Sequence, residues 1–287
     1  MSRNSSRTKI NRPTPQPSQP NIAPPQQQQS NPFGISFVVP TEVIELPTRG
    51  RFYEQDSTLY GRQNVEIRHM TAREEDLLAN QSFIEDGSVF DRLLGSILVD
   101  KSIDVQELIE TDRNAILIAA RITGYGSEYS MKMPCSHCRK VCEFVFNLEE
   151  REIVENELDG VSFESDSGLF CFQLPKLTLE AKVKVLTGRD LEYLDKQKQR
   201  AEELGLEHNA TINLFRLAVV EVQGISDQSH LNQLFEALPA IDSRKIRSVV
   251  NSITPRVSTK QKVACGSCGE ESESEVPFTL GFFWPDL

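Results

Sequence analysis

Two Cys-x-x-Cys pairs, far apart in the chain, are the residues best suited to carry chemistry. The first is Cys135 and Cys138 in "PCSHC", and the second is Cys265 and Cys268 in "ACGSCG", 130 residues later. Structural zinc sites are closed, tetrahedral and rich in thiolates, and their ligands come in pairs at this spacing. One pair supplies only two ligands, so neither pair completes a tetrahedral site alone. We therefore predict one structural zinc ion per chain, shared by all four cysteines.

Other chemistries fit these cysteines less well. A thioredoxin-type redox pair begins a helix beside a βαβ unit, whereas both pairs here lie between strand-like segments. The zinc deaminase signature needs His-x-Glu upstream, and none of the four histidines is followed by Glu two positions later. A catalytic zinc also needs an open coordination position, which four thiolates do not leave. His137 could replace one cysteine as a ligand, while Cys142 and Cys171 are expected to be small core residues.

The elements that must position the cysteines follow one another in the same order twice. "VEIRHM" from Val65 alternates like a strand, and Thr71 and Glu74 then have the spacing of a helix capping box. "AKVKVL" from Ala181 and "TGRDLEYLDKQ" from Thr187 repeat this strand and capped helix. Further helices are predicted over "SVFDRLLGSILV", "DVQELI" and "DRNAILIAARITG" in the first half, and over "INLFRLAVVEV", "QSHLNQLFEAL" and "DSRKIRSVVNSI" in the second.

Corresponding residues are separated by an offset that grows in one direction along the chain. It is 116 from Thr71 to Thr187, and it reaches 130 for Asp112 and Asp242 and for the cysteine pairs. Another aspartate pair, Asp104 and Asp227, lies at 123. Asp104 and Asp112 are also suited to N-cap the helices that they begin. We predict an α+β fold of two diverged repeats, roughly 43–148 and 170–280, joined by a four-cysteine zinc ribbon. The predicted domains are a tail (1–34), a first repeat (35–148) and a linker plus second repeat (149–287).

Composition bounds the class of protein. The 287 residues are 38% hydrophobic and 25% charged, as is usual for a globular protein. Residues 1–34 are rich in Pro, Gln, Ser and Asn, which predicts a disordered tail. This tail carries four basic residues and no acid, so the net charge of −11 leaves −15 for the rest of the chain. An acidic body of this kind repels nucleic acid.

Neither a membrane span nor a secretory signal is expected. No apolar run approaches the roughly 18 residues that a membrane span needs. The first residues contain no apolar stretch typical of a secretory signal. We therefore expect a reducing compartment, in which cysteine pairs bind metals more often than they form disulfides.

Other motifs do not indicate catalysis. The chain lacks a Walker-type loop, a Gly-x-Ser-x-Gly elbow and a His-Glu-x-x-His motif, so we expect no enzyme and no small-molecule substrate. "LPTRGRFY" from Leu46 is interpreted as an ordered turn against the core, with a docking loop for a partner as the alternative. The aromatic C-terminus, "FTLGFFWPDL", is expected to complete the core, and Trp284 is a candidate for docking.

These motifs together resemble one known family. "LPTRGRFY", "DRLLGSILVDKSID", "RNAILIAARITGYGSEY", the two cysteine pairs and "FFWPD" are similar to the baseplate hub proteins of contractile-tailed, T-even-type bacteriophages, over roughly residues 40–287. The resemblance implies a non-enzymatic virion or assembly protein whose partners are other baseplate hub and tail proteins. It also implies a location in the host bacterial cytoplasm during assembly or in the tail baseplate of the virion. The tail of 1–34 is not part of the family pattern.

A second class of function remains open, since many zinc ribbons are regulatory proteins that bind nucleic acid. Such a role requires a basic face around the knuckles. The first knuckle carries Lys132, Arg139 and Lys140, but the second is followed by four glutamates: Glu270, Glu271, Glu273 and Glu275. We therefore rank nucleic-acid binding below the structural role.

Overall fold

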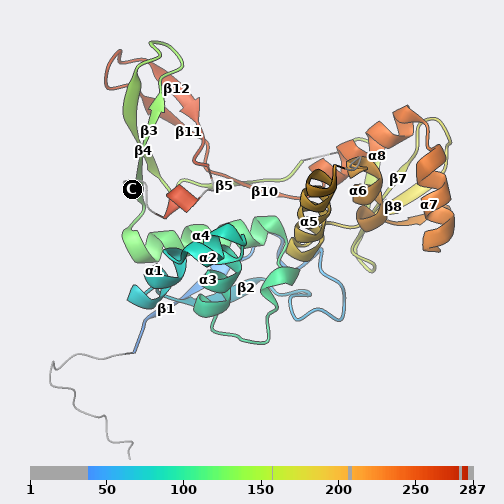
Figure 1. The fold of residues 1–287 in the computed structure, drawn as a ribbon, viewed down its shortest axis with the longest axis horizontal. Helices are drawn as coiled ribbons and strands as arrows, with labels where there is room; N and C mark the ends of the chain where they lie inside the picture. The colour runs from blue at the N-terminus through green and yellow to red at the C-terminus, as the bar shows by residue number, and fades with distance from the viewer. Residues whose placement is uncertain (1–37, 157, 206–208, 278–279, 284–287) are drawn as a thin grey trace, which may run out of the picture. The chain divides into compact units, whose positions relative to one another are not determined.

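Short antiparallel sheets and helices alternate along the chain, so the fold is α+β as predicted (Figure 1). The computed structural model describes residues 38–156, 158–205, 209–277 and 280–283, and residues 39–287 form one compact unit. The predicted disordered tail and Trp284 lie outside the described residues. The division at residue 148 stays a prediction.

The first half begins with a two-stranded sheet whose second strand leads into helices. Strand β1 (Thr41–Glu45) pairs antiparallel with β2 (Asn64–Arg68), with Ile44 opposite Val65. Past α3, Leu98 bridges to Ile67 and the Val99 N–H donates to the Glu66 carbonyl, so the chain returns to the far edge of β2. The helices of this half are α1 (Ala72–Leu78), α2 (Gln81–Glu85), α3 (Val89–Ile97), the 3₁₀ turn η1 (Val105–Glu107) and α4 (Glu110–Tyr125).

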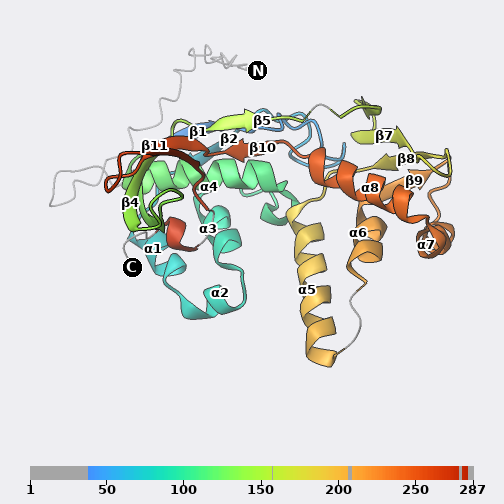
Figure 2. The same cartoon turned by 90° about the horizontal axis from the view of Figure 1, so that it is seen from above.

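The second half contains a four-stranded antiparallel sheet in the order β6-β7-β8-β9. Its strands are β6 (Val161–Glu164), β7 (Leu169–Gln173), β8 (Glu180–Val183) and β9 (Val219–Val222), and its helices are α5 (Gly188–Leu204), α6 (Ala210–Ala218), α7 (Gln228–Ala237) and α8 (Ala240–Ser252). Helix α5 runs beside α6 and buries none of its described residues (Figure 2).

Each half ends in a β-hairpin that carries a cysteine pair. The first hairpin is β3 (Glu128–Pro134) with β4 (Val141–Asn147), and the second is β11 (Gln261–Ala264) with β12 (Glu271–Ser274). Another small sheet links segments from both halves, because β5 (Glu152–Val154) pairs with β10 (Arg256–Ser258). The last element is the 3₁₀ turn η2 (Leu280–Phe282).

The two described aromatic residues of the C-terminal segment complete the core, as predicted for this segment. Phe282 and Phe283 are buried, and their rings lie 5.5 Å from Tyr129 and 6.0 Å from Phe90, respectively. Such pairs stabilise a fold beyond the area that they bury. Segments from the first half and the C-terminus thereby form one hydrophobic core.

The capping box predicted at Thr71 is present, and the capped helix predicted from Thr187 also begins with a capping box. The Thr71 N–H donates to Glu74 Oε2 at 3.0 Å, and the Thr187 N–H donates to Asp190 Oδ2 at 3.1 Å. Each box satisfies a backbone donor that the first turn of a helix leaves without an intrahelical partner. Both helices therefore begin where the sequence placed them.

Two interpretations of local sequence were wrong. "INLFRLAVVEV" is not one helix, because α6 ends at Ala218 and Val219–Val222 pair with β8 as β9. The β-branched valines favour a strand, and the open edge of β8 supplies its hydrogen bonds. "DVQELI" forms only the 3₁₀ turn η1, although Asp104 caps it by accepting from the Gln106 N–H.

A third error concerns the aspartate near the start of the last long helix in the first half. Asp112 was expected to be an N-cap, but α4 begins two residues before it and its N-cap is Ile109. Asp242 holds the same place in α8, whose N-cap is Pro239. Both aspartates are fully buried. They are held there by hydrogen bonds from loops distant in the sequence, which local spacing does not reveal.

Candidate metal centre

The first cysteine pair lies in a tight knuckle between β3 and β4. The Cys135 N–H donates to the Lys140 carbonyl at 2.9 Å, and the Arg139 N–H donates to the Cys135 carbonyl at 2.9 Å. Arg139 has a positive φ of 60°, which reverses the chain. The His137 N–H also points to Cys135 Sγ, at 3.4 Å. Both sulfurs of the pair are thereby held on one side of the turn.

The second pair repeats these contacts one for one. The Cys265 N–H donates to the Glu270 carbonyl at 2.9 Å, and the Gly269 N–H donates to the Cys265 carbonyl at 2.8 Å. The Ser267 N–H lies 3.4 Å from Cys265 Sγ. Gly269 takes the positive φ, here 76°, that Arg139 takes in the first knuckle. A glycine adopts this conformation without the steric cost that a side chain adds.

The two knuckles bring all four sulfurs together. The Sγ atoms of Cys135, Cys138, Cys265 and Cys268 lie within 4.8 Å of one another. The contacts cross between the hairpins, since Cys135 Sγ is 3.9 Å from Cys268 Sγ and Cys138 Sγ is 3.9 Å from Cys265 Sγ. Zn–S bonds of about 2.3 Å in a tetrahedron place sulfurs roughly 3.8 Å apart. These four cysteines are therefore positioned to bind one metal ion.

Backbone donors and neighbouring thiols change the acidity of the second pair. Hydrogen bonds from the backbone N–H groups of Cys268 and Ser267 lower the pKa of the Cys265 thiol to about 6. A backbone N–H from Glu270 favours the Cys268 thiolate, but burial and hydrogen bonding with the other thiols raise the pKa of Cys268 to about 12. Four thiolates this close repel one another, so a bound cation is needed to hold them all deprotonated.

A fifth cysteine lies beside the cluster. Cys142, opposite Met133 in the β3–β4 ladder, has its Sγ 3.5 Å from Cys265 Sγ. Cys142 is half-buried and packs against the core, whereas Cys171 is buried in β7 of the four-stranded sheet. Sequence spacing did not indicate the approach of Cys142. It arises because β4 lies beside the second hairpin, which is a tertiary contact.

The side-chain amide of Gln261 joins the two hairpins away from the sulfurs. Gln261 Nε2 donates to the Asn147 carbonyl at 2.6 Å, and Gln261 Oε1 accepts from the Asn147 N–H at 3.0 Å. Figure 1 shows the hairpins β3–β4 and β11–β12 side by side. These two hydrogen bonds fix the alignment of the hairpins along their strands, so the two knuckles lie opposite each other.

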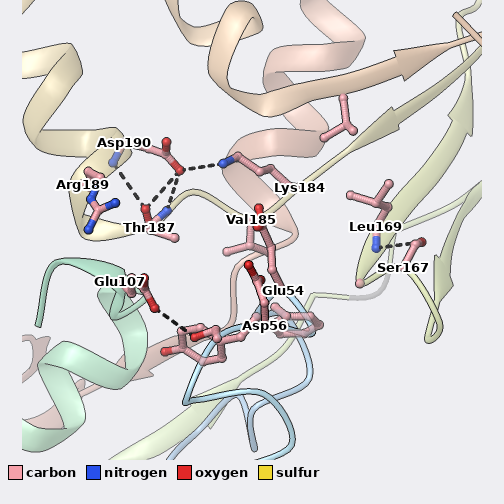
Figure 3. A pocket seen from close by; sticks show the side chains of 15 residues that line it. Glu54, Asp56, Glu107, Ser167, Leu169, Lys184, Val185, Thr187, Arg189 and Asp190 are labelled. Carbon is pink, nitrogen blue, oxygen red and sulfur yellow. Dashed lines mark hydrogen bonds and ion pairs between the residues drawn. The ribbon is translucent and has the colours of Figure 1, made fainter. Parts of the chain in front are cut away.

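A cleft of about 520 Å³ is the other candidate site (Figure 3). Several of its polar residues form structural contacts: Lys184 lies 3.2 Å from Asp190, which also belongs to the capping box of α5, and Glu107 accepts from Ser57 at 3.0 Å. The residues that line the described part of the cleft include neither histidine nor cysteine. The contacts described in the cleft are therefore an ion pair, a helix cap and a serine–carboxylate hydrogen bond.

The fold and this centre define a class: an α+β protein in which four cysteines from two hairpins form one metal-binding cluster. The family model described as T4 bacteriophage base plate protein matches residues 51–284. Because the match covers most of the chain, the protein belongs to this family, which confirms the resemblance at the level of the baseplate.

Membership makes the chain a structural protein of the phage tail that contacts other tail proteins. A search of curated proteins and a search of solved structures each found no match. Among the described residues, no helix is both long and apolar enough to cross a bilayer.

Proposed function

We propose that this protein is a non-enzymatic component of the baseplate hub, or a factor in its assembly, held rigid by one structural zinc ion. The observation that carries the proposal is the cluster of four cysteine sulfurs, contributed two by two from hairpins 130 residues apart in the sequence. A closed set of four thiolates leaves no coordination position for a substrate. The ion therefore links the ends of the two halves and acts through structure.

Zinc is the metal that this ligand set favours. Four thiolates in a tetrahedron suit zinc or iron–sulfur chemistry, while calcium and magnesium prefer oxygen ligands. The paired knuckle geometry, with a backbone N–H directed at the first sulfur of each pair, is compatible with one mononuclear ion. The ligands that we assign are Cys135, Cys138, Cys265 and Cys268.

The proposal includes an internal duplication, supported by matching contacts. Ile44 lies opposite Val65 at the start of one sheet, and Phe172 lies opposite Ala181 in the other. Ile44 corresponds to Phe172 at an offset of 128, as the Leu-Pro dipeptides do, and Val65 corresponds to Ala181 at 116, as the capping threonines do. The offset therefore falls before Thr71 and grows only after it, while the register relative to these two landmarks is the same in both sheets. Each first strand is followed by Leu-Pro, and each second strand by a threonine capping box. Two related halves linked by a metal could present similar faces to neighbouring subunits.

The zinc ion and its sharing are tested by metal analysis of the purified protein. We expect one zinc per chain in the wild type and none in the Cys265→Ser/Cys268→Ser double variant. Cys171→Ser is the matched control, because this cysteine is buried away from the cluster and should leave the zinc content unchanged. Two zinc ions that fall to one in the double variant would contradict a shared site.

The hub role is tested separately in infected cells. A phage with a stop codon in this gene, grown in a host that does not suppress it, should arrest before baseplates are complete. Electron microscopy of the lysate should then show heads without attached tails, and the wild-type gene supplied in trans should restore tails. Normal tails without the protein would refute the role, whatever the metal content.

A nucleic-acid-binding zinc ribbon is the rival function. Lys132, Arg139 and Lys140 are exposed at the first hairpin, which favours it locally. The second hairpin opposes it, since its strand β12 carries exposed glutamates and Lys260 is paired with Glu273 at 2.6 Å. A gel shift with duplex DNA that weakens as salt rises would support this rival.

A further inference from the structure

Strand β1 has an outer edge that is open in the described part of the chain. The His69 N–H donates to the Pro40 carbonyl at 2.9 Å and the Leu46 N–H donates to the Gln63 carbonyl at 2.7 Å, so even-numbered residues bond to β2. The alternation of an antiparallel ladder turns the backbone groups of Thr41, Val43 and Glu45 the other way. All three residues are exposed, Val43 at 65%, and among the described residues none of their backbone groups forms a hydrogen bond.

The corresponding edge in the second half is covered. Strand β7 matches β1: it pairs with the next strand in the same register, its Leu174 N–H donates to the Leu179 carbonyl, and Leu-Pro follows it. Its outer edge carries β6, with Ser162 opposite Cys171 and Phe163 opposite Phe170. An unpaired edge is a template for another strand. The pairing of β6 with β7 therefore serves as a template for the strand that would pair with the outer edge of β1.

A copy of β6 exists in the sequence before β1. Gly34–Phe37 read Gly-Ile-Ser-Phe, and Gly160–Phe163 read Gly-Val-Ser-Phe. The segment from this phenylalanine to the next Leu-Pro dipeptide is two residues shorter in the first half than in the second. The β6–β7 turn includes Gly168, which has a positive φ of 70° and whose N–H donates to the Glu164 carbonyl.

The shorter connection opposes a hairpin within one chain. In the register of β6 and β7, Val38 would face Thr41, which leaves only Val39 and Pro40 for the turn. Two-residue hairpin turns require a positive φ at their first position, which a β-branched valine resists. Pro40 is also already bonded through its carbonyl to His69 in the ladder with β2.

We propose that residues 34–37 of a second copy of this chain pair antiparallel with the outer edge of β1, and that this exchange is mutual. The template register places Ser36 of one copy opposite Val43 of the other, and Ile35 opposite Ile44. The two-fold axis then passes between Val39 and Pro40 of the two chains. One patch contacts itself, which is the geometry of a closed dimer. The backbone of Pro40 faces β2, so its lack of an N–H does not interrupt the ladder between the two copies.

The proposal goes beyond the hub role and does not depend on the metal ion. It rests on the correspondence between β1 and β7 and on the repeated Gly-x-Ser-Phe segment. Swapped segments with short, stiff hinges are a known route to dimers. The copies exchange identical segments, so the same two contacts form in both directions.

Sedimentation equilibrium of the full chain is the first test. We expect a concentration-dependent dimer whose dissociation constant is unchanged by deletion of residues 1–33 and which is lost on deletion of residues 1–37. Val43→Pro removes an outward N–H at both symmetric contacts and should weaken dimerisation by roughly tenfold or more. Val43→Thr keeps the N–H and the branched side chain, so it is the matched control. A wild type that stays monomeric, or a dimer that survives deletion of 1–37, overturns the proposal.

A second measurement separates exchange between chains from folding back within one chain. Phe37 is replaced by a photocrosslinking amino acid in a ¹⁵N-labelled chain, which is mixed with unlabelled wild-type protein. Mass spectrometry should find crosslinks from the labelled chain to unlabelled peptides that contain Thr41–Glu45. Crosslinks only within labelled chains, or only to other segments, refute the exchange. If Val43→Pro lowers the unfolding midpoint, its loss of dimerisation could reflect unfolding, and the proposal is then judged by the two deletions and the crosslinks.

Discussion

Asp112 and Asp242 are each the third residue of their helices, and each accepts hydrogen bonds from a loop that follows a Leu-Pro dipeptide. Asp112 Oδ1 accepts from the Thr48 N–H at 3.0 Å, and its Oδ2 accepts from the Tyr53 hydroxyl at 2.7 Å. Asp242 accepts from the N–H groups of Lys176 and Leu177, at 2.7 and 3.1 Å. Both carboxylates are inaccessible to solvent. In both halves, one buried acid therefore attaches the strand-exit loop to the last long helix.

The first prediction concerns Asp112→Asn and Asp242→Asn. At Asp242 the amide NH₂ would face a backbone N–H, and at Asp112 it would face either a backbone N–H or the hydroxyls of Thr48 and Tyr53 that donate to Oδ2. In each case at least one buried donor loses its acceptor. We expect each variant to lower the free energy of unfolding by about 1–3 kcal/mol. Urea denaturation measures this. Asp104→Asn is the control, because asparagine also caps helices well and this position is exposed. Equal stability of all three variants would contradict the role that we assign to the buried acids.

The second prediction is a pH dependence that originates at Glu74. Burial alone would raise the pKa of this carboxyl, but hydrogen bonds from Arg68, Ser96 and Thr71 overcome it and lower the pKa to about 2. The unfolded chain binds a proton near pH 4.5, before the folded chain does. The stabilisation is therefore complete above that pH and is lost as the pH falls toward 2, with a size on the order of 3 kcal/mol.

Glu74→Gln should remove most of this pH dependence while lowering stability at neutral pH. The measurement is the free energy of unfolding from pH 7 to pH 3, compared with the wild type. Glu85→Gln, at an exposed position on α2, is the control and should keep the wild-type slope. A wild-type slope in the Glu74 variant would assign the acid sensitivity to other carboxyls.

The third prediction compares two glycines that share a backbone conformation. Gly50 and Gly87 have φ of 71° and 73°, but a Cβ at Gly50 would lie 2.3 Å from the Arg62 nitrogen and 2.6 Å from the Leu59 carbonyl. No atom lies within 4 Å of a Cβ at Gly87. Gly87→Ala should therefore cost about 1 kcal/mol, the strain of a positive φ alone. Gly50→Ala should cost clearly more, because backbone must move. Thermal unfolding of both variants checks the order.

The fourth prediction concerns metal removal. A chelator should destabilise both cysteine hairpins together, since metal binding energy is folding energy for a site that two segments share. Hydrogen exchange followed by mass spectrometry should show faster exchange in β3–β4 and in β11–β12 at the same chelator concentration. The sheet β6-β7-β8-β9 provides the internal reference. Loss of protection in one hairpin alone would indicate that the pairs act independently.

Local patterns in the sequence determined much of what the structure contains. The capping boxes at Thr71 and Thr187, the strands that precede them and the strand–knuckle–strand flanks of the cysteine pairs depend on residues within a few positions of one another. Capping and alternation are short-range effects, so the residues that cause them lie inside the pattern itself. The four candidate ligands could be named for the same reason.

Only the tertiary structure decided the features that depend on distant partners. Val219–Val222 became a strand because β8 offered an open edge, and Asp112 and Asp242 turned inward because two Leu-Pro loops present N–H donors there. The approach of Cys142 to Cys265 and the edge of β1 that no described residue covers also depend on distant parts of the chain. In each case a polar or apolar group either faces water or contacts a partner that folding brings close. The sequence alone specifies which groups need a partner, while the packed chain determines which partner each group meets.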